Sequence, residues 1–258
     1  MFFSFFKRPI NSRQRVYRVP AGERIYAIGD VHGRADLLRT LQDQILQDAR
    51  QSPRVKSRVV YLGDYVDRGP SVRETLDLVV DGLRDDFEVT CLRGNHEQLL
   101  LDFLEDPTTL PAWVALGGLW TLRSYGVPCN RASLQGTQAA QELRQALSVS
   151  LPEAHFSLLS TLPVYQQIGD YLFVHAGVRP GVALERQARE DCLWIRNEFL
   201  DSHHGLACMV VHGHTIISYP EFHFGRLAID TGAYATGVLT CAVFESTGVR
   251  YLQTGAAQ

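Results

Sequence analysis

The chain has 258 residues, of which 45% are hydrophobic and 21% are charged, so it is an ordinary globular protein long enough to bury a large core. A net charge of −3 gives no electrostatic case for binding nucleic acid, whose partners usually carry a basic face. The five cysteines are an odd count without Cys-x-x-Cys spacing, so we expect reduced core residues of a cytoplasmic protein rather than a disulfide framework or a thiolate zinc site.

The first 20 residues are predicted to form an N-terminal tail. Two basic residues, Lys7 and Arg8, follow four aromatic ones: Phe2, Phe3, Phe5 and Phe6. A signal peptide would place its charge before the apolar residues, and a membrane span would need about 20 apolar residues, so we expect neither. The tail is expected to fold onto the body or to stay disordered. The alternative is a short interfacial anchor, with the rings among lipid headgroups.

Five short apolar runs that end in glycine predict strands, at residues 24–29, 58–63, 88–94, 171–177 and 208–213. Between the first three runs, residues 34–50 and 71–85 carry the stripe of apolar residues that is typical of amphipathic helices. A strand–helix–strand–helix–strand order predicts a parallel sheet with crossover helices.

The stretch 97–160 differs from its neighbours. Its segments 97–106, 111–126 and 132–149 indicate helices separated by Pro, Gly and polar breaks, so we expect a helical insert within a single domain over 21–258. After Ser202, short runs at 226–232, 239–246 and 248–254 predict strands of a second sheet with antiparallel character.

Polar residues follow each of the five predicted strands where it ends: Asp30 and His32; Asp64, Asp67 and Arg68; Asn95 and His96; His175; His212 and His214. Functional sites of open α/β sheets lie outside the carboxyl ends of the strands, so we expect one convergent site. Carboxylate, amide and imidazole groups without cysteine suit Mn, Fe, Zn or Mg. The set exceeds the ligands of one ion, which predicts two divalent ions, and a neighbouring arginine would bind an anion such as phosphate.

The motifs GDVHG (29–33), GDYVDRG (63–69), RGNHE (93–97), HAG (175–177) and GHT (213–215) resemble the signature of the calcineurin-like metallophosphoesterases. The second and third resemble those of the phosphoprotein phosphatase (serine/threonine phosphatase) family. The segments LWIRNE (193–198) and IDTGA (229–233) resemble its compact bacterial and phage branch, typified by bacteriophage lambda phosphatase. The resemblance implies an α/β fold with two central β-sheets flanked by helices, a four-layer α/β/β/α sandwich that carries the helical insert.

The resemblance also implies roles for the residues that match the motifs. The implied metal ligands are Asp30, His32, Asp64, Asn95, His175 and His214. Asp64 would bridge two divalent ions, for which we expect Mn²⁺, with Fe, Zn or Mg as alternatives, and a hydroxide held between the ions would attack phosphorus. Arg68, Asn95 and Arg196 would bind the substrate phosphate. His96 would be the general acid, oriented by Asp67.

The predicted function is metal-dependent hydrolysis of phosphomonoesters, with phosphoserine and phosphothreonine in proteins, or small phosphate esters, as substrates. A dinucleoside polyphosphate (diadenosine tetraphosphate) hydrolase is the alternative, although such enzymes typically lack the acid that stands here at Asp67. A non-catalytic scaffold is a third reading. Such proteins usually lose ligands or the acid, and every matched position is filled here.

Several residues near the motifs keep two interpretations. His212 is expected at the end of a buried strand, either hydrogen-bonded to a metal ligand or to Asp230, or packed as a core histidine. Asp230 either orients a histidine or forms a turn. Glu97 is expected to interact with the dipole at a helix N-terminus. We interpret four other histidines as surface or loop residues: His155, His203, His204 and His223.

Overall fold

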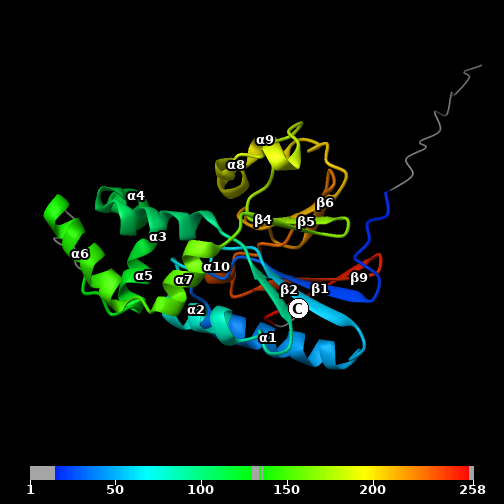
Figure 1. The fold of residues 1–258 in the computed structure, drawn as a ribbon, viewed down its shortest axis with the longest axis horizontal. Coiled ribbons are helices and arrows are strands. Elements are labelled where there is room, and N and C mark those ends of the chain that lie inside the picture. Colours follow the sequence, from blue (N-terminus) through cyan, green and yellow to red (C-terminus); the bar gives the residue numbers. More distant parts are fainter. Residues whose placement is uncertain (1–14, 130–133, 135, 256–258) are drawn as a thin grey trace, which may run out of the picture.

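The structure is a computed structural model that describes residues 15–129, 134 and 136–255. Two five-stranded β-sheets pack face to face, with helices on the outer face of each (Figure 1). This arrangement is the predicted α/β sandwich with helices on both outer faces. The four N-terminal phenylalanines of the anchor hypothesis lie outside the described residues. Within the predicted tail, Val19 is buried, and its backbone N–H donates to Ser246.

The first sheet has the strand order β10-β9-β1-β2-β3. Its strands are β1 (Glu23–Ile28), β2 (Lys56–Tyr61), β3 (Glu88–Cys91), β9 (Thr240–Glu245) and β10 (Gly248–Gln253). Strands β1, β2 and β3 are parallel and are linked by α1 (Ala35–Arg50) and α2 (Val72–Asp81), as predicted. Both helices cover the outer face of this sheet (Figure 1).

The second sheet has the order β4-β5-β6-β8-β7 and is mixed, where we expected antiparallel character. Its strands are β4 (Tyr165–Ile168), β5 (Tyr171–Val174), β6 (Met209–His212), β7 (Glu221–His223) and β8 (Arg226–Ala228). Its outer face carries a 3₁₀ turn (Leu184–Arg186), α8 (Arg189–Trp194) and α9 (Asn197–Leu200).

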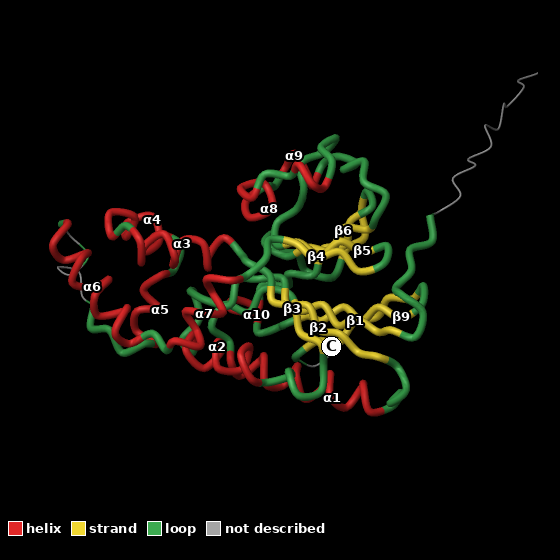
Figure 2. Tube along the Cα trace, in the orientation of Figure 1, coloured by secondary structure: helices red, strands yellow, loops and turns green. Residues whose placement is uncertain are grey.

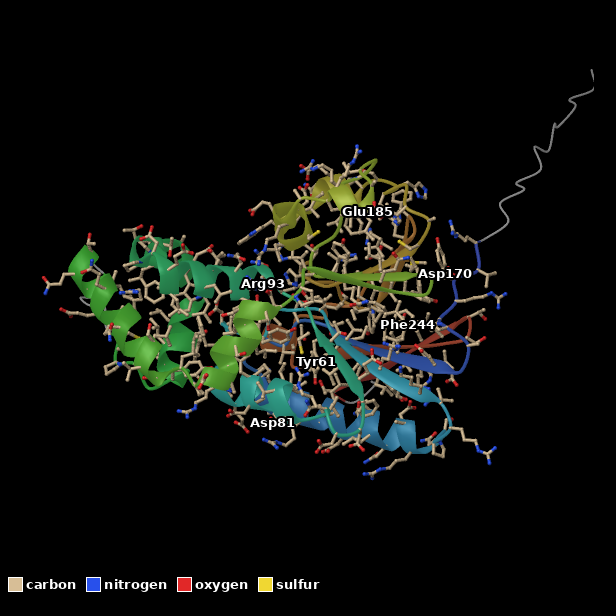
Figure 3. The ribbon with its side chains drawn as sticks, viewed as in Figure 1. Tyr61, Asp81, Arg93, Asp170, Glu185 and Phe244 are labelled. Carbon is tan, nitrogen blue, oxygen red and sulfur yellow. The ribbon has the colours of Figure 1, made fainter. Side chains whose placement is uncertain are left out.

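The prediction that the last two strands join the second sheet is wrong. Strands β9 and β10 form a hairpin on the first sheet, where β9 pairs antiparallel with β1. The physical reason is that β9 is apolar on both faces. Cys241 and Val243 pack with the helix-side core, whereas Ala242 and Phe244 pack between the sheets. Figure 3 shows Phe244 between the two sheets.

Alternating side chains give the central strands two buried faces. In β1, Tyr26 and Ile28 face the core under the helices, and Ile25 and Ala27 face the core between the sheets. A third core packs β5 and β6 against α8 and α9 and includes Phe199. The carboxyl ends of strands in both sheets are therefore fixed by cores on both sides.

The helical stretch between β3 and β4 lies beside the sheets (Figure 2). It comprises α3 (Asn95–Glu105), a 3₁₀ turn (Pro107–Thr109), α4 (Leu110–Ala115), α5 (Gly118–Ser124), α6 (Thr137–Ser150) and α7 (Glu153–Thr161). The helix predicted over 111–126 is broken at Gly117, whose φ of 114° ends α4 before α5 begins. A last short helix, α10 (Ala233–Thr236), follows β8. Among the described residues, none of the helices combines the length and apolar character that a membrane crossing requires.

Candidate functional site

The motif loops of both sheets meet where their strands end, as the sequence predicts. The candidate ligand atoms of His32, Asp64 and His96 lie within 4.8 Å of one another, and so do those of Asp64, His175 and His214. We call these groups the first and the second cluster. Asp64 belongs to both, and all five side chains are buried.

In the second cluster, groups that carry lone pairs face one another. His175 bonds the Leu62 carbonyl through Nδ1 at 2.9 Å, so that nitrogen carries the proton and Nε2 presents a lone pair. This lone pair faces Asn95 Oδ1 at 2.9 Å and Asp64 Oδ2 at 3.5 Å, and both are acceptors. Burial lowers the pKa of His175, and burial together with His175 lowers the pKa of His214 to about 2, so both imidazoles stay neutral as metal ligands must.

In the first cluster, too, a histidine Nδ1 bonds a backbone carbonyl and its Nε2 faces Asp64. His32 donates from Nδ1 to the Val66 carbonyl at 2.8 Å, and its Nε2, which has no hydrogen-bond partner, lies 3.3 Å from Asp64 Oδ2. Burial acts to lower the pKa of His32, but the nearby Asp64 carboxylate outweighs it and raises the pKa. The pocket thus favours positive charge between these two residues. Oxygen and nitrogen donors arranged in this way fit divalent metal ions.

Asp30 lies beside these clusters. Its two carboxylate oxygens accept from the His214 backbone N–H at 3.2 and 3.0 Å. Burial and the charges of Asp230 and Asp64 raise its pKa well above the usual range. Three buried carboxylates this close repel one another, which a bound cation would relieve. Asp230 itself accepts from Gly232 N at 2.8 Å, the turn-forming interpretation left open by the sequence.

The backbone around the clusters is strained. Seven non-glycine residues in the described chain have positive φ, and five of them stand in the motif loops: His32, Asp64, Asp67, Arg68 and His214, at 47° to 68°. Such conformations cost about 1–3 kcal/mol each and persist where the surroundings over-determine them. The surrounding structure therefore holds these loops in conformations that are unfavourable for the isolated chain.

Glu97 is one of the groups that hold these loops. Its buried carboxylate accepts from the backbone N–H groups of Gly94, Asp64, Tyr65 and Val66 at 2.8 to 3.2 Å. It is the third residue of α3, where a carboxylate interacts favourably with the dipole of the helix N-terminus, as predicted. The structure adds a second role, because the same carboxylate fixes the Asp64 loop.

The predicted acid pair is in contact. His96 Nδ1 lies 2.8 Å from Asp67 Oδ2, and its Nε2 points into the first cluster, 3.9 Å from Asp64 Oδ2. The structure adds two neighbours that the sequence reasoning missed, Trp113 and Thr121, which hydrogen-bond the Asp67 carboxylate. No local spacing marks them, because they lie about fifty residues from Asp67 in the chain and reach it only through tertiary packing.

The predicted phosphate-binding arginines lie at the rim. Arg68 is half-buried, with its guanidinium 4.9 Å from the ring centre of Tyr234, a neighbour that the sequence reasoning also missed. Arg196 is exposed and donates to Thr215 Oγ1 at 3.1 Å. Arg93, although inside the RGNHE motif, is buried and bonds the Leu159 carbonyl at the end of α7 (labelled in Figure 3), so it serves packing.

His155, predicted to be a surface or loop residue, is buried within α7, which contradicts that prediction, whereas His204 lies in a loop, as predicted, although it is buried. His155 bonds Tyr125 Oη at 2.8 Å and Asp77 at 2.9 Å, and His204 bonds the Gly225 carbonyl. Polar partners from distant elements make these positions compatible with burial. His203 and His223 are exposed as expected. All five cysteines are free and four of them are buried, as predicted.

Residues 23–243 match the family model of the calcineurin-like phosphoesterases. The chain belongs to this family. This phosphoesterase is 29% identical over 232 residues to serine/threonine-protein phosphatase 1 of Salmonella typhimurium, covering 84% of this chain and 90% of the relative. It is 25% identical to the asymmetrical bis(5'-nucleosyl)-tetraphosphatase PrpE of Bacillus subtilis, covering 83% and 87%. The phosphatase relative supports the phosphoprotein phosphatase family, and the lambda-type branch stays a prediction.

A crystal structure provisionally described as a diadenosine tetraphosphatase superposes on the phosphoesterase with a TM-score of 0.61. It is 20% identical and covers 95% of this chain and 100% of its own, which shows the shared fold. The family and the clusters together make this protein a metal-dependent hydrolase of phosphate esters.

Proposed function

We propose that this phosphoesterase hydrolyses phosphomonoesters, with phosphoserine and phosphothreonine in proteins as its substrates. The buried His96–Asp67 pair beside Asp64 carries the proposal. A serine or threonine alkoxide is a poor leaving group that needs a proton, and an imidazolium held by a carboxylate can supply it. A nucleotide leaving through a phosphate oxygen needs that proton far less, so the pair is of most use to a monoesterase.

In this proposal, each candidate site residue has one chemical role. The metal ligands are Asp30, His32, Asp64, Asn95, His175 and His214. When bound, two divalent ions, for which we propose Mn²⁺, lower the pKa of water and neutralise phosphate oxygens. Arg68 and Arg196 pair with the nonbridging oxygens from the rim, assisted by the Asn95 amide. His96 gives its Nε2 proton to the leaving oxygen, while Asp67 holds Nδ1.

A substrate panel under excess Mn²⁺ tests the proposal. It compares a phosphoserine peptide, a phosphothreonine peptide, a small alkyl phosphate and diadenosine tetraphosphate. We expect kcat/KM to be highest on the phosphopeptides. The proposal is wrong if diadenosine tetraphosphate is hydrolysed with a higher kcat/KM than every monoester.

That outcome would favour the second candidate, a dinucleoside polyphosphate hydrolase. The observation in its favour is that relatives with tetraphosphatase names match as much of this chain as the phosphatase relative does. The two candidates share the metal clusters and differ in the leaving group. Product analysis separates them, because only the second releases nucleotides from a nucleotide substrate.

Metal removal gives a further prediction. Protein stripped by a chelator is expected to be inactive and to recover with Mn²⁺, because its buried carboxylates and imidazoles face one another without a cation. Metal analysis of the reconstituted protein should give about two ions per chain. Full activity with one bound ion, or with none, would contradict the two-ion assignment.

A further inference from the structure

We propose that Thr121 and Trp113 in the helical insert are positioning residues that orient the general acid through Asp67. This inference rests on the proposed function, in which His96 protonates the leaving group. It gives the insert a role at the active site. Among the described residues, neither side chain hydrogen-bonds a member of the two clusters, and both bond the carboxylate that holds His96.

The Asp67 carboxylate is fully buried and surrounded by donors. Thr121 Oγ1 donates to its Oδ1 at 2.5 Å, and Trp113 Nε1 lies 3.1 and 3.0 Å from Oδ1 and Oδ2. His96 Nδ1 lies 2.8 Å from Asp67 Oδ2. Thr121 and Trp113 are themselves 0% exposed. With Oδ1 held by the hydroxyl, the carboxylate plane is fixed and Oδ2 is aimed at the imidazole.

The same hydroxyl also holds the backbone. Thr121 Oγ1 accepts from the Asp67 N–H at 3.1 Å, and Asp67 has a φ of 68°, which is costly for a residue with a Cβ. The next residue, Arg68, donates its N–H to the Gly117 carbonyl at 3.4 Å. Helix α5 and the residue before it, Gly117, thus support two successive residues of the motif loop that have positive φ.

Trp113 links both halves of the acid pair. Its ring stacks on Phe103, with centroids 4.9 Å apart and planes at 28°. Phe103 lies on α3, the helix whose first turn contains His96. A single indole therefore contacts the helix that carries the acid and bonds the carboxylate that orients it. Because catalytic geometry must be held to fractions of an ångström, such contacts set the rate.

The experiment compares Thr121→Val, which removes the hydroxyl at nearly constant volume, with Thr121→Ser, which keeps it. Thr75→Val is the matched control, since the buried Thr75 hydroxyl has no hydrogen-bond partner. We expect Thr121→Val to lower kcat on a phosphoserine peptide by about 10-fold to 100-fold, and on p-nitrophenyl phosphate by less than about 3-fold. KM should stay unchanged, and Thr121→Ser and Thr75→Val should behave as wild type.

A spectroscopic readout on the metal-free protein is independent of activity. The His96 Nδ1–H proton, bonded to a buried carboxylate, should give a downfield proton NMR signal that is assigned by its loss in His96→Asn. It should persist in Thr121→Ser and shift or broaden in Thr121→Val. Trp113→Phe, which removes the indole N–H, should change the signal in the same direction.

The outcomes separate this inference from the proposed function. Equal losses on both substrates in Thr121→Val, or an unchanged NMR signal, would overturn the positioning role and leave a purely structural one. If His96→Asn itself shows no leaving-group dependence, the proposed function fails first. Leaving-group dependence in both His96→Asn and Thr121→Val, but not in Thr75→Val, supports the inference.

Discussion

His214→Ala is expected to abolish activity and to lose one of two bound metal ions, whereas His212→Phe is expected to keep both ions and much of the rate. His214 Nδ1 lies 3.2 Å from His175 Nε2 in the second cluster, where both imidazoles are buried and neutral. An alanine there removes the imidazole nitrogen that we propose as a metal ligand. The ion would lose affinity, and the reaction would lose the charge that it supplies.

His212 has different surroundings although it stands only two residues away. Its Nδ1 bonds the Gly213 carbonyl at 3.1 Å, and its ring packs edge-on against Phe199 at 5.1 Å. Burial lowers its pKa to about 3, so the ring is neutral. Within the described residues it makes no hydrogen bond to a candidate ligand or to Asp230, which favours the core interpretation. A phenylalanine fits this apolar setting and forfeits one hydrogen bond, worth about 1 kcal/mol.

Metal analysis of both variants, reconstituted in parallel with wild type, is the decisive measurement. Thermal unfolding serves as the control for folding, and His212→Phe should melt within a few degrees of wild type. If His212→Phe loses an ion while His214→Ala retains two, the roles of the pair are reversed.

The sequence predicted which side chains gather at the strand ends better than the sheet to which each strand belongs. Asp64 and His175 each follow an apolar run. The end of such a run marks the carboxyl end of a strand, and the following side chain lies there in whichever sheet the strand pairs. Membership of a sheet depends on which edge is free. The run 239–246 pairs with the edge of β1 that β2 leaves free, and its apolar residues on both faces indicate burial on both sides, a property that strands of either sheet share. The hairpin was therefore assigned to the wrong sheet.

Support groups were harder to predict than ligands for a related reason. Trp113 and Thr121 lie in a stretch that indicates only a helix, and their contact with Asp67 depends on the break at Gly117. His155 likewise became a core residue through Tyr125, thirty positions away. A polar residue's partner is a property of tertiary packing, and one sequence does not contain it. Glu97 is a partial exception. Its place at a helix N-terminus could be predicted because a helix start is a local signal, but its bonds to the Asp64 loop could not.

His96→Asn is expected to reduce activity unequally across substrates. His96 is fully buried with Nδ1 on Asp67 and with Nε2 free of partners, which leaves Nε2 as the atom able to give a proton. A phosphoserine peptide should lose about 10²–10⁴-fold in kcat, the range of general acid catalysis. The loss on p-nitrophenyl phosphate should be much smaller, because p-nitrophenolate leaves without help.

The location of His96 demands one more measurement, because its ring is also a member of the first cluster. Metal content must be determined for His96→Asn at the concentrations used for kinetics. Two ions per chain together with unequal losses identify a proton donor. Equal losses on both substrates would show that His96 positions phosphate or metal, and loss of an ion would make it a ligand. The buried contact with Asp67 favours the first result, since a carboxylate on Nδ1 fixes the ring and leaves Nε2 as the nitrogen that faces the cluster.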